Sequence, residues 1–206
     1  MYLVKTPWWL KKVYNASLTW KIHTRQNEIF ITFDDGPHPQ ITPFVLDCLK
    51  QFDAKATFFC IGKNVKEFPA IYEQLISAGH SVGNHTYHHL NGWKTENSEY
   101  FENIDLATRY INSTLFRPPY GRISKRQATQ LQPRFNIIMW DVLSGDFDVN
   151  LSPEKCLKNV TANTVPGSII VFHDSEKAQT RLEYVLPKAL QYFAKKGYFM
   201  RAIEYR

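Results

Sequence analysis

Two adjacent acids lie where a strand is predicted to end. Asp34 and Asp35 follow a run of β-forming residues at 28–33, and Gly36 with Pro37 then forces a turn. Side-by-side carboxylates repel each other unless one is protonated or a cation lies nearby. The pair therefore raises the question whether the rest of the chain supplies a cation.

Three histidines within five residues could hold such a cation. The cluster reads HTYHH, so His85 and His89 have the i,i+4 spacing that one helical turn places on one side. The i,i+3 pair of His85 and His88 is geometrically possible as well. With Asp35 as an oxygen donor, two imidazoles give three protein ligands and leave a position for water. That number of ligands is typical of a catalytic zinc-type site rather than of a closed structural one.

The same metal would explain why two neighbouring carboxylates can both be ionised. If Asp35 binds the metal, Asp34 can accept a proton from the metal-bound water. Metal binding lowers the pKa of that water from 15.7 towards about 7, so hydroxide becomes available at neutral pH. The residues thus predict that one acid is a ligand and its neighbour is a base.

The elements that must position these residues alternate between strands and helices. Seven segments have the pattern of strands, at residues 28–33, 56–61, 80–84, 115–117, 135–140, 168–172 and 198–203. Helical patterns separate most of them, the two longest at residues 95–115 and 180–196. This alternation indicates a parallel sheet with crossover helices. We therefore predict an α/β fold, a distorted (β/α) barrel with about seven parallel strands rather than eight.

Composition favours one folded domain without a nucleic-acid partner. The chain has 206 residues, of which 44% are hydrophobic, so it can bury a substantial core. Its formal net charge is +6, but the basic residues are scattered among acids and form no basic block. The three cysteines are an odd number without close pairs, which argues against a disulfide framework or a thiolate zinc site.

The N-terminal residues are expected to form an extension, at residues 1–24. Thr6 and Pro7 are of the types that begin a helix, so a helix that packs on the barrel is predicted there. Its Trp and Lys content would also suit peripheral contact with a membrane through residues 1–20. No uninterrupted apolar stretch of a secretory signal is visible, which favours a cytoplasmic or peripherally membrane-associated location. The sequence does not indicate an oligomeric state.

Four motifs at the ends of predicted strands resemble the signatures of the polysaccharide deacetylases, the NodB homology domain of carbohydrate esterase family four. They are TFDDGP at residues 32–37, HTYHH at 85–89, RPPYG at 117–121 and IVFHD at 170–174. All four occur in the family's order. The resemblance implies a distorted (β/α) barrel, a catalytic domain at residues 25–206, and metal-dependent removal of acetyl groups from N-acetylated sugars.

The resemblance gives the first two motifs distinct roles. It implies that Asp34 is the general base and that the metal ligands are Asp35, His85 and His89, to the exclusion of His88. Zinc is the expected metal, with cobalt and nickel as alternatives.

The other two motifs receive roles around the reacting acetamide. Arg117 is expected to hold Asp34 in position by a charge-assisted hydrogen bond. The backbone N–H of Tyr120 would join the metal in stabilising the oxyanion of the tetrahedral intermediate. His173 would be the general acid that protonates the departing amine.

A fifth segment, residues 140–147, resembles the family's remaining motif less closely. Asp146 matches the carboxylate that is expected to orient His173 and to raise its pKa. Phe147 and Val171 differ from the residues usual at their positions, which changes the shape of the sugar groove. Three residues are expected to contact the substrate: Phe147, Tyr120 and Val171.

The expected reaction is hydrolysis of N-acetyl groups on N-acetylglucosamine-containing glycans, such as chitin oligomers or peptidoglycan, with release of acetate. Two other enzymatic alternatives are O-deacetylation of a polysaccharide such as xylan and deacylation of a lipid-linked amino sugar. An alternative of a different class is a glycan-binding protein that has lost catalysis. The presence of both a base, Asp34, and an acid, His173, opposes that alternative, because a pure binder needs neither.

Overall fold

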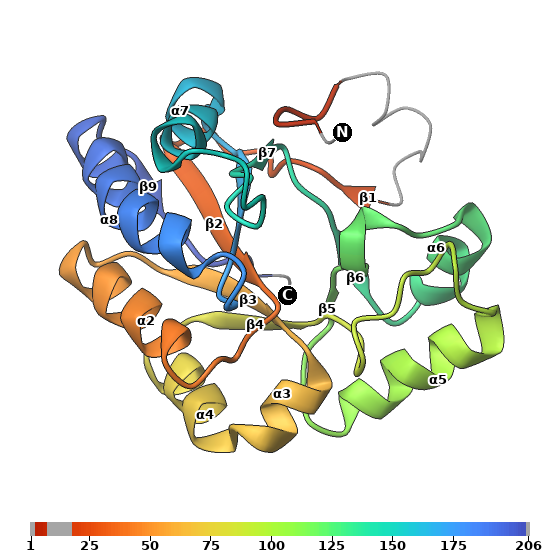
Figure 1. Cartoon of the computed structure of the whole chain (residues 1–206). Helices are drawn as coiled ribbons and strands as arrows, with labels where there is room; N and C mark the ends of the chain where they lie inside the picture. The colour runs from red at the N-terminus through yellow and green to blue at the C-terminus, as the bar shows by residue number, and fades with distance from the viewer. Residues whose placement is uncertain (1–2, 8–17, 205–206) are drawn as a thin grey trace.

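A single curled sheet forms the centre of the protein, and helices lie around its outside (Figure 1). The structure is a computed structural model that describes residues 3–7 and 18–204. Within these residues the strand order is β1-β6-β5-β4-β3-β2-β8-β7, with β9 paired to β2, and each pair of strands is parallel. The predicted α/β distorted barrel is confirmed.

The described elements alternate along the chain. The strands are β1 (Leu18–Thr19), β2 (Glu28–Asp34), β3 (Ala56–Cys60), β4 (Ser81–Asn84), β5 (Leu115–Phe116), β6 (Asn136–Ile138), β7 (Val142–Leu143), β8 (Ile169–His173) and β9 (Phe199–Met200). The helices are α2 (Ile41–Gln51), α3 (Gly62–Glu67), α4 (Pro69–Ser77), α5 (Asn97–Thr108), α6 (Lys125–Leu131), α7 (Pro153–Asn163) and α8 (Gln179–Lys195), with a 3₁₀ turn, η2 (Pro119–Gly121).

The structure differs from the sequence prediction at four elements. Strands β1 and β7, of two residues each, were not predicted. Strands β5 and β9 are equally short, but they lie within the segments 115–117 and 198–203 that have the pattern of strands. Helix α3 was not predicted either. Helix α5 ends at Thr108, well before residue 115, because the chain must turn back to begin β5. Ile111 is nevertheless buried, so its helical spacing reflected core packing rather than a longer helix.

Alternation along β2 explains how its last acid reaches the interior of the curled sheet. Three side chains of this strand pack with the helices in the main hydrophobic cluster: Ile29, Ile31 and Phe33. Phe30 belongs to a smaller cluster on the opposite face. Because successive residues of a strand point to opposite faces, Asp34 lies on the same face as Phe30.

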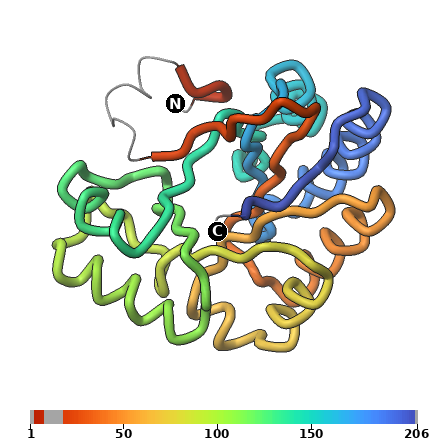
Figure 2. Tube along the Cα trace, turned by 180° about the vertical axis from the view of Figure 1, so that it is seen from behind, coloured from red at the N-terminus to blue at the C-terminus, as the bar shows by residue number. Residues whose placement is uncertain are grey.

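The first described residues lie along the free edge of β7, as the view from behind in Figure 2 shows. The Leu143 N–H donates a hydrogen bond of 2.8 Å to the Val4 carbonyl. Lys5 forms an antiparallel bridge with Val142, and its Nζ lies 2.6 Å from Oδ2 of the buried Asp141. Residues 3–7 are thus hydrogen-bonded to the sheet.

The helix predicted to begin at Thr6 and Pro7 would continue over residues 8–14, which lie outside the described residues. The division of the chain at residue 24 stays a prediction, although β1, within the predicted extension, pairs with β6.

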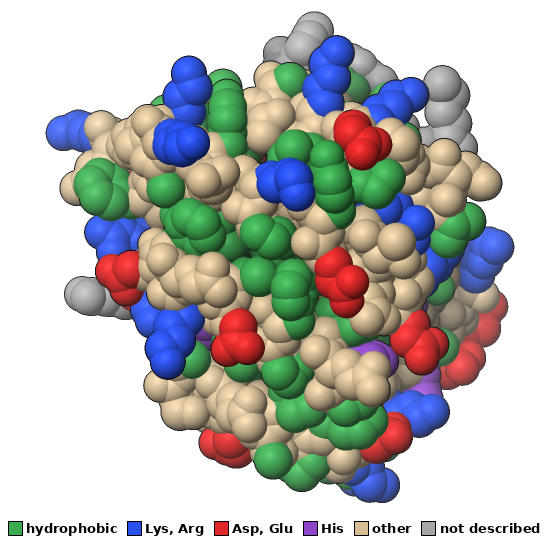
Figure 3. Space-filling model, turned by 60° about the vertical axis from the view of Figure 1, so that its left-hand side comes forward, with side chains coloured by type: hydrophobic (Ala, Val, Ile, Leu, Met, Phe, Trp, Pro, Cys, Tyr) green, Lys and Arg blue, Asp and Glu red, His purple; other side chains and the backbone are tan. Residues whose placement is uncertain are grey.

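Charges of both signs are interspersed on the face shown in Figure 3. This distribution agrees with the scattered basic residues of the sequence, and the absence of a nucleic-acid partner stays a prediction. None of the described helices is both long and apolar enough to cross a membrane.

Candidate active site

The predicted site residues meet at the carboxyl ends of the parallel strands. Asp34 ends β2 and is in register with His173, which ends β8. His85 directly follows β4, and Arg117 directly follows β5. Loops at this end of a parallel barrel are where active sites lie, because the side chains of several strands converge there.

Asp35, His85 and His89 form a cluster that fits a divalent metal. Their ligand atoms all lie within 4.8 Å of one another, and Asp35 Oδ1 is 3.2 Å from His89 Nε2 and 3.8 Å from His85 Nε2. This carboxylate oxygen is buried and has no hydrogen-bond partner within the described residues. A cation would satisfy it, and a set of two imidazoles and one carboxylate is a donor set of zinc sites.

The ionisation of these ligands is suited to metal binding. Burial lowers the pKa of His85 to about 4, so its ring is neutral at neutral pH. Its Nδ1 lies 2.7 Å from the Arg117 carbonyl, which leaves Nε2 as the free ligand atom. Burial alone would raise the pKa of Asp35, but the imidazoles of His89, His173 and His85 hold it below the usual value.

His88 has another partner. Its Nδ1 accepts a hydrogen bond of 2.9 Å from the amide of Asn103, whose Oδ1 in turn accepts from the N–H groups of Tyr87 and His88 at 2.9 Å each. The structure therefore favours His89 over His88 as the second imidazole ligand. Sequence reasoning missed Asn103, although its place between Tyr100 and Ile104 on the buried face of α5 could have identified it.

Arg117 fixes the orientation of the predicted base. The guanidinium is fully buried, and its NH1 donates a hydrogen bond of 2.6 Å to Asp34 Oδ1. Its NH1 also donates to the Thr32 hydroxyl at 2.7 Å, and Nε and NH2 donate to the carbonyls of Ile138 and Met139 at 3.1 and 3.0 Å. Because several contacts hold the guanidinium, it offers Asp34 one charge-assisted partner in a fixed direction.

Asp146 orients His173, the predicted general acid. Its carboxylate accepts hydrogen bonds of 2.8 Å from both the ring Nδ1 and the backbone N–H of His173. Burial alone would lower the pKa of His173, but the Asp146 carboxylate outweighs it and raises the pKa to about 9. The Asp146 carbonyl also accepts from Nε of the buried Arg181 at 2.5 Å, a contact from α8 that the sequence did not reveal.

A hollow of about 840 Å³ opens over these groups. The three residues predicted to contact the substrate, Phe147, Tyr120 and Val171, all line it. The Tyr120 side chain is 60% exposed, and its hydroxyl lies 3.1 Å from His89 Nδ1. The Phe147 ring meets the His173 ring edge-on, with 5.1 Å between centroids.

Backbone strain is concentrated in the loops of the site. Among the described residues, five other than glycine have a positive φ, and four of them belong to these loops: Asp35 (83°), Thr86 (63°), His89 (59°) and Tyr120 (60°). Such conformations cost free energy and persist only where the surroundings enforce them, which is typical of functional sites.

Asp174 anchors the turn that carries Asp35. Its Oδ1 accepts the Gly36 N–H at 3.1 Å, and its Oδ2 accepts the Thr42 hydroxyl at 2.5 Å. A Cβ at position 36 would lie 2.1 Å from Asp174 Oδ2, so only glycine allows this approach. The sequence placed Asp174 in a motif but did not indicate this contact, which joins positions far apart in the chain.

We expect Asp174→Ala to lower the free energy of unfolding by about 2 kcal/mol or more, because two buried donors lose their acceptor. It should also weaken binding of a divalent metal, since the turn that carries Asp35 loses its anchor. Urea denaturation and chelator competition measure the two effects. The exposed Asp53→Asn is the control, and an Asp174→Ala protein with unchanged stability and metal affinity would contradict the anchoring role.

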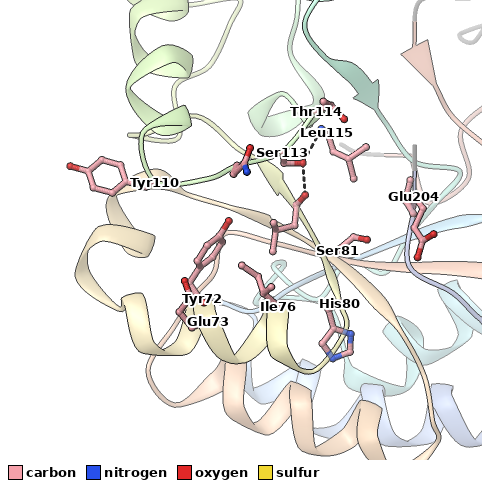
Figure 4. A pocket seen from close by; sticks show the side chains of 13 residues that line it. Tyr72, Glu73, Ile76, His80, Ser81, Tyr110, Ser113, Thr114, Leu115 and Glu204 are labelled. Carbon is pink, nitrogen blue, oxygen red and sulfur yellow. Dashed lines mark hydrogen bonds between the residues drawn. The ribbon is translucent and has the colours of Figure 1, made fainter. Parts of the chain in front are cut away.

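A second hollow, of about 700 Å³, lies at the opposite end of the strands, beside the beginnings of β4 and β5 (Figure 4). Several polar groups around it are bound within the fold. His80 Nδ1 accepts the Ala56 N–H at 3.2 Å, and the Ser113 hydroxyl donates to the Val82 carbonyl at 2.6 Å. None of the three metal-site residues lines this hollow, so the chemistry belongs to the other end.

The fold and the site together define a polysaccharide deacetylase domain. The family model for polysaccharide deacetylases matches residues 21–133, and the chain belongs to this family.

Relatives of the chain are known by activity and by structure. A peptidoglycan-N-acetylglucosamine deacetylase of Bacillus cereus is 38% identical over 72% of this chain, which spans 56% of that relative's length. A chitooligosaccharide deacetylase of Azorhizobium caulinodans is 36% identical, over 75% of this chain and 77% of its own. The crystal structure of the Bc1960 peptidoglycan N-acetylglucosamine deacetylase, in complex with a 4-naphthalen-1-yl-N-oxidanyl-benzamide, superimposes with a TM-score of 0.86 at 32% identity, covering 96% of this chain and 95% of that one.

Proposed function

We propose that this protein hydrolyses the N-acetyl groups of N-acetylglucosamine-containing glycans and releases acetate. One observation carries the proposal. Beside the Asp35–His85–His89 cluster lie two separately positioned groups, Asp34 held by Arg117 and His173 held by Asp146. The relatives named above, which act on peptidoglycan and on chitooligosaccharides, support the substrate class.

Asp34 is suited to accept a proton from the attacking water. A divalent metal bound by the cluster, zinc by its donor set, would lower the pKa of a coordinated water towards about 7. Arg117 holds Oδ1 of Asp34 by a hydrogen bond next to the cluster of metal ligands. The other carboxylate oxygen of Asp34, Oδ2, stays available to take that proton.

Tyr120 and His173 act on the negative charge that develops on the acetamide oxygen and on the departing amine. The Tyr120 N–H makes no hydrogen bond within the described part of the chain and can donate to the developing oxyanion. His173 donates a proton from its ring to the departing amine, which leaves poorly as an anion. Its Nδ1 is bound to Asp146, so the proton that is transferred comes from Nε2.

The elevated pKa of His173 predicts the alkaline limit of activity. The group must be protonated to act as an acid, so kcat/KM should fall as the pH rises through its pKa of about 9. The Asp146→Asn substitution removes the negative charge that raises the pKa of His173, while burial still lowers this pKa. We therefore expect the alkaline limb to move down by roughly 1–3 pH units.

The pH profile of kcat/KM measures this shift. Glu176→Gln removes an exposed acid close to His173 in sequence and is the matched control. An alkaline limb that moved equally in both variants, or in neither, would exclude the pairing of His173 with Asp146 as its cause.

The deciding experiment measures acetate released from chitin oligomers, peptidoglycan and acetylated xylan, each with chelator and after addition of zinc, cobalt or nickel. We expect release from the N-acetylated glycans, loss with chelator, and recovery with metal. Release from xylan alone would make the protein an O-deacetylase. Glycan binding that survives chelator, with no acetate from any substrate, would make it a binding protein.

A further inference from the structure

Three exposed cationic side chains line the catalytic hollow. Lys94 lies in the loop before α5, Arg122 directly follows η2, and Lys177 lies between β8 and α8. Because they come from separate loops, their presence in one hollow could not be seen from the sequence.

These cations have no acidic partners in the hollow. Within the described residues none of the three forms a salt bridge. The acids next to two of them in sequence, Glu96 and Glu176, are exposed and do not line the hollow.

Two carboxylates line the hollow, fewer than its three exposed cations. Among the described lining residues they are Asp34 and Asp35. Asp34 is paired with the buried Arg117, and Asp35 faces His85 and His89. The hollow therefore carries an excess of positive charge, and low-dielectric walls increase the effect of such charge on a ligand.

Stacking on Trp93 orients the Arg122 guanidinium, which can bind a planar anion. Its Cζ lies 4.2 Å from the centre of the Trp93 ring, and this ring is itself 55% exposed. Stacking on an aromatic ring limits the freedom of a guanidinium while its N–H donors stay available at the edge. Those donors match the two oxygens of a carboxylate.

We propose that Lys94, Arg122 and Lys177 form an anion subsite, which binds a carboxylate on the sugar next to the N-acetylglucosamine that is deacetylated. The subsite rests on the proposed function and narrows its substrate class. It favours a glycan in which N-acetylglucosamine alternates with an acid sugar, such as the lactyl-ether sugar of peptidoglycan strands that carry no stem peptide, over a neutral homopolymer.

Binding of three matched oligosaccharides tests the subsite. The first is a peptidoglycan tetrasaccharide with free lactyl carboxylates, the second is the same molecule with these groups amidated, and the third is chitotetraose. Dissociation constants are measured by calorimetry with zinc-loaded protein that carries Asp34→Asn to stop turnover. The variants add Lys94→Gln, Arg122→Gln and Lys177→Gln, singly and together, with the exposed Lys195→Gln on α8 as control.

We expect the triple variant to bind the acidic tetrasaccharide about tenfold more weakly, because each exposed charge pair contributes a factor of a few. Binding of the amidated tetrasaccharide and of chitotetraose should change less than twofold. Added salt should weaken binding of the acidic ligand in the same selective way. Lys195→Gln should leave all three dissociation constants unchanged.

Equal effects on acidic and amidated ligands, or no effect on either, would overturn the subsite. The proposed function has a separate readout, acetate release by the protein with Asp34 intact. Acetate release without charge discrimination would leave the deacetylase and remove the subsite. Charge discrimination without acetate release would keep the anion subsite and contradict the proposed deacetylase activity.

Discussion

Replacing Asp34 with Asn is expected to lower kcat by about 10²–10⁴-fold, the range for loss of a general base. An amide can still accept the hydrogen bond from Arg117, so the site should keep its shape. It cannot take a proton from the attacking water. Metal content should remain stoichiometric, because the ligands are Asp35, His85 and His89. Acetate release and metal analysis of the same preparation measure the two quantities.

The exposed Asp53→Asn is the matched control for this substitution and should leave kcat unchanged. Full activity of Asp34→Asn would end the assignment of Asp34 as base. Loss of metal together with activity would instead place Asp34 among the ligands.

Replacing His89 with Ala should remove stoichiometric zinc and lower kcat/KM on the order of 10³-fold. The magnitude follows from the several kcal/mol of charge stabilisation that a bound metal supplies. Oδ1 of Asp35 lies 3.2 Å from His89 Nε2, so this substitution removes the imidazole nearest to the carboxylate ligand. Metal analysis after dialysis and acetate release are the measurements.

His88→Ala is the matched control, one residue away in the same loop. Its ring is bound to Asn103, so the variant should keep stoichiometric zinc even if the loop loses some stability. Zinc loss in His88→Ala together with retention in His89→Ala would reverse the ligand assignment.

The sequence predicted those site residues that lie at the end of a strand or directly after it. Asp34, His85 and Arg117 end or follow predicted strands, and parallel strands bring such positions to one end of a sheet. Seven strands were visible because each overlaps a segment of three to six residues that has the pattern of a strand. The same reasoning failed for β1 and β7, because no such segment was recognised around their two residues.

The residues whose contacts sequence reasoning missed act on partners far away in the chain. Asn103 fixes the histidine loop, Asp174 anchors the turn at Gly36, and Arg181 binds the carbonyl of Asp146. Each contact joins distant positions, and a lone polar residue has no spacing from which its partner can be inferred. The roles assigned to the catalytic residues stay predictions until turnover is measured.

The pairing of residues 3–7 with β7 has a consequence for handling the protein. A strand with unsatisfied backbone groups at its border is a template on which a second molecule can add. Here Val4 and Lys5 occupy that border by an antiparallel bridge and a backbone hydrogen bond. A truncated chain that lacks them is expected to self-associate, with a loss of monodispersity that light scattering would detect before any loss of catalysis.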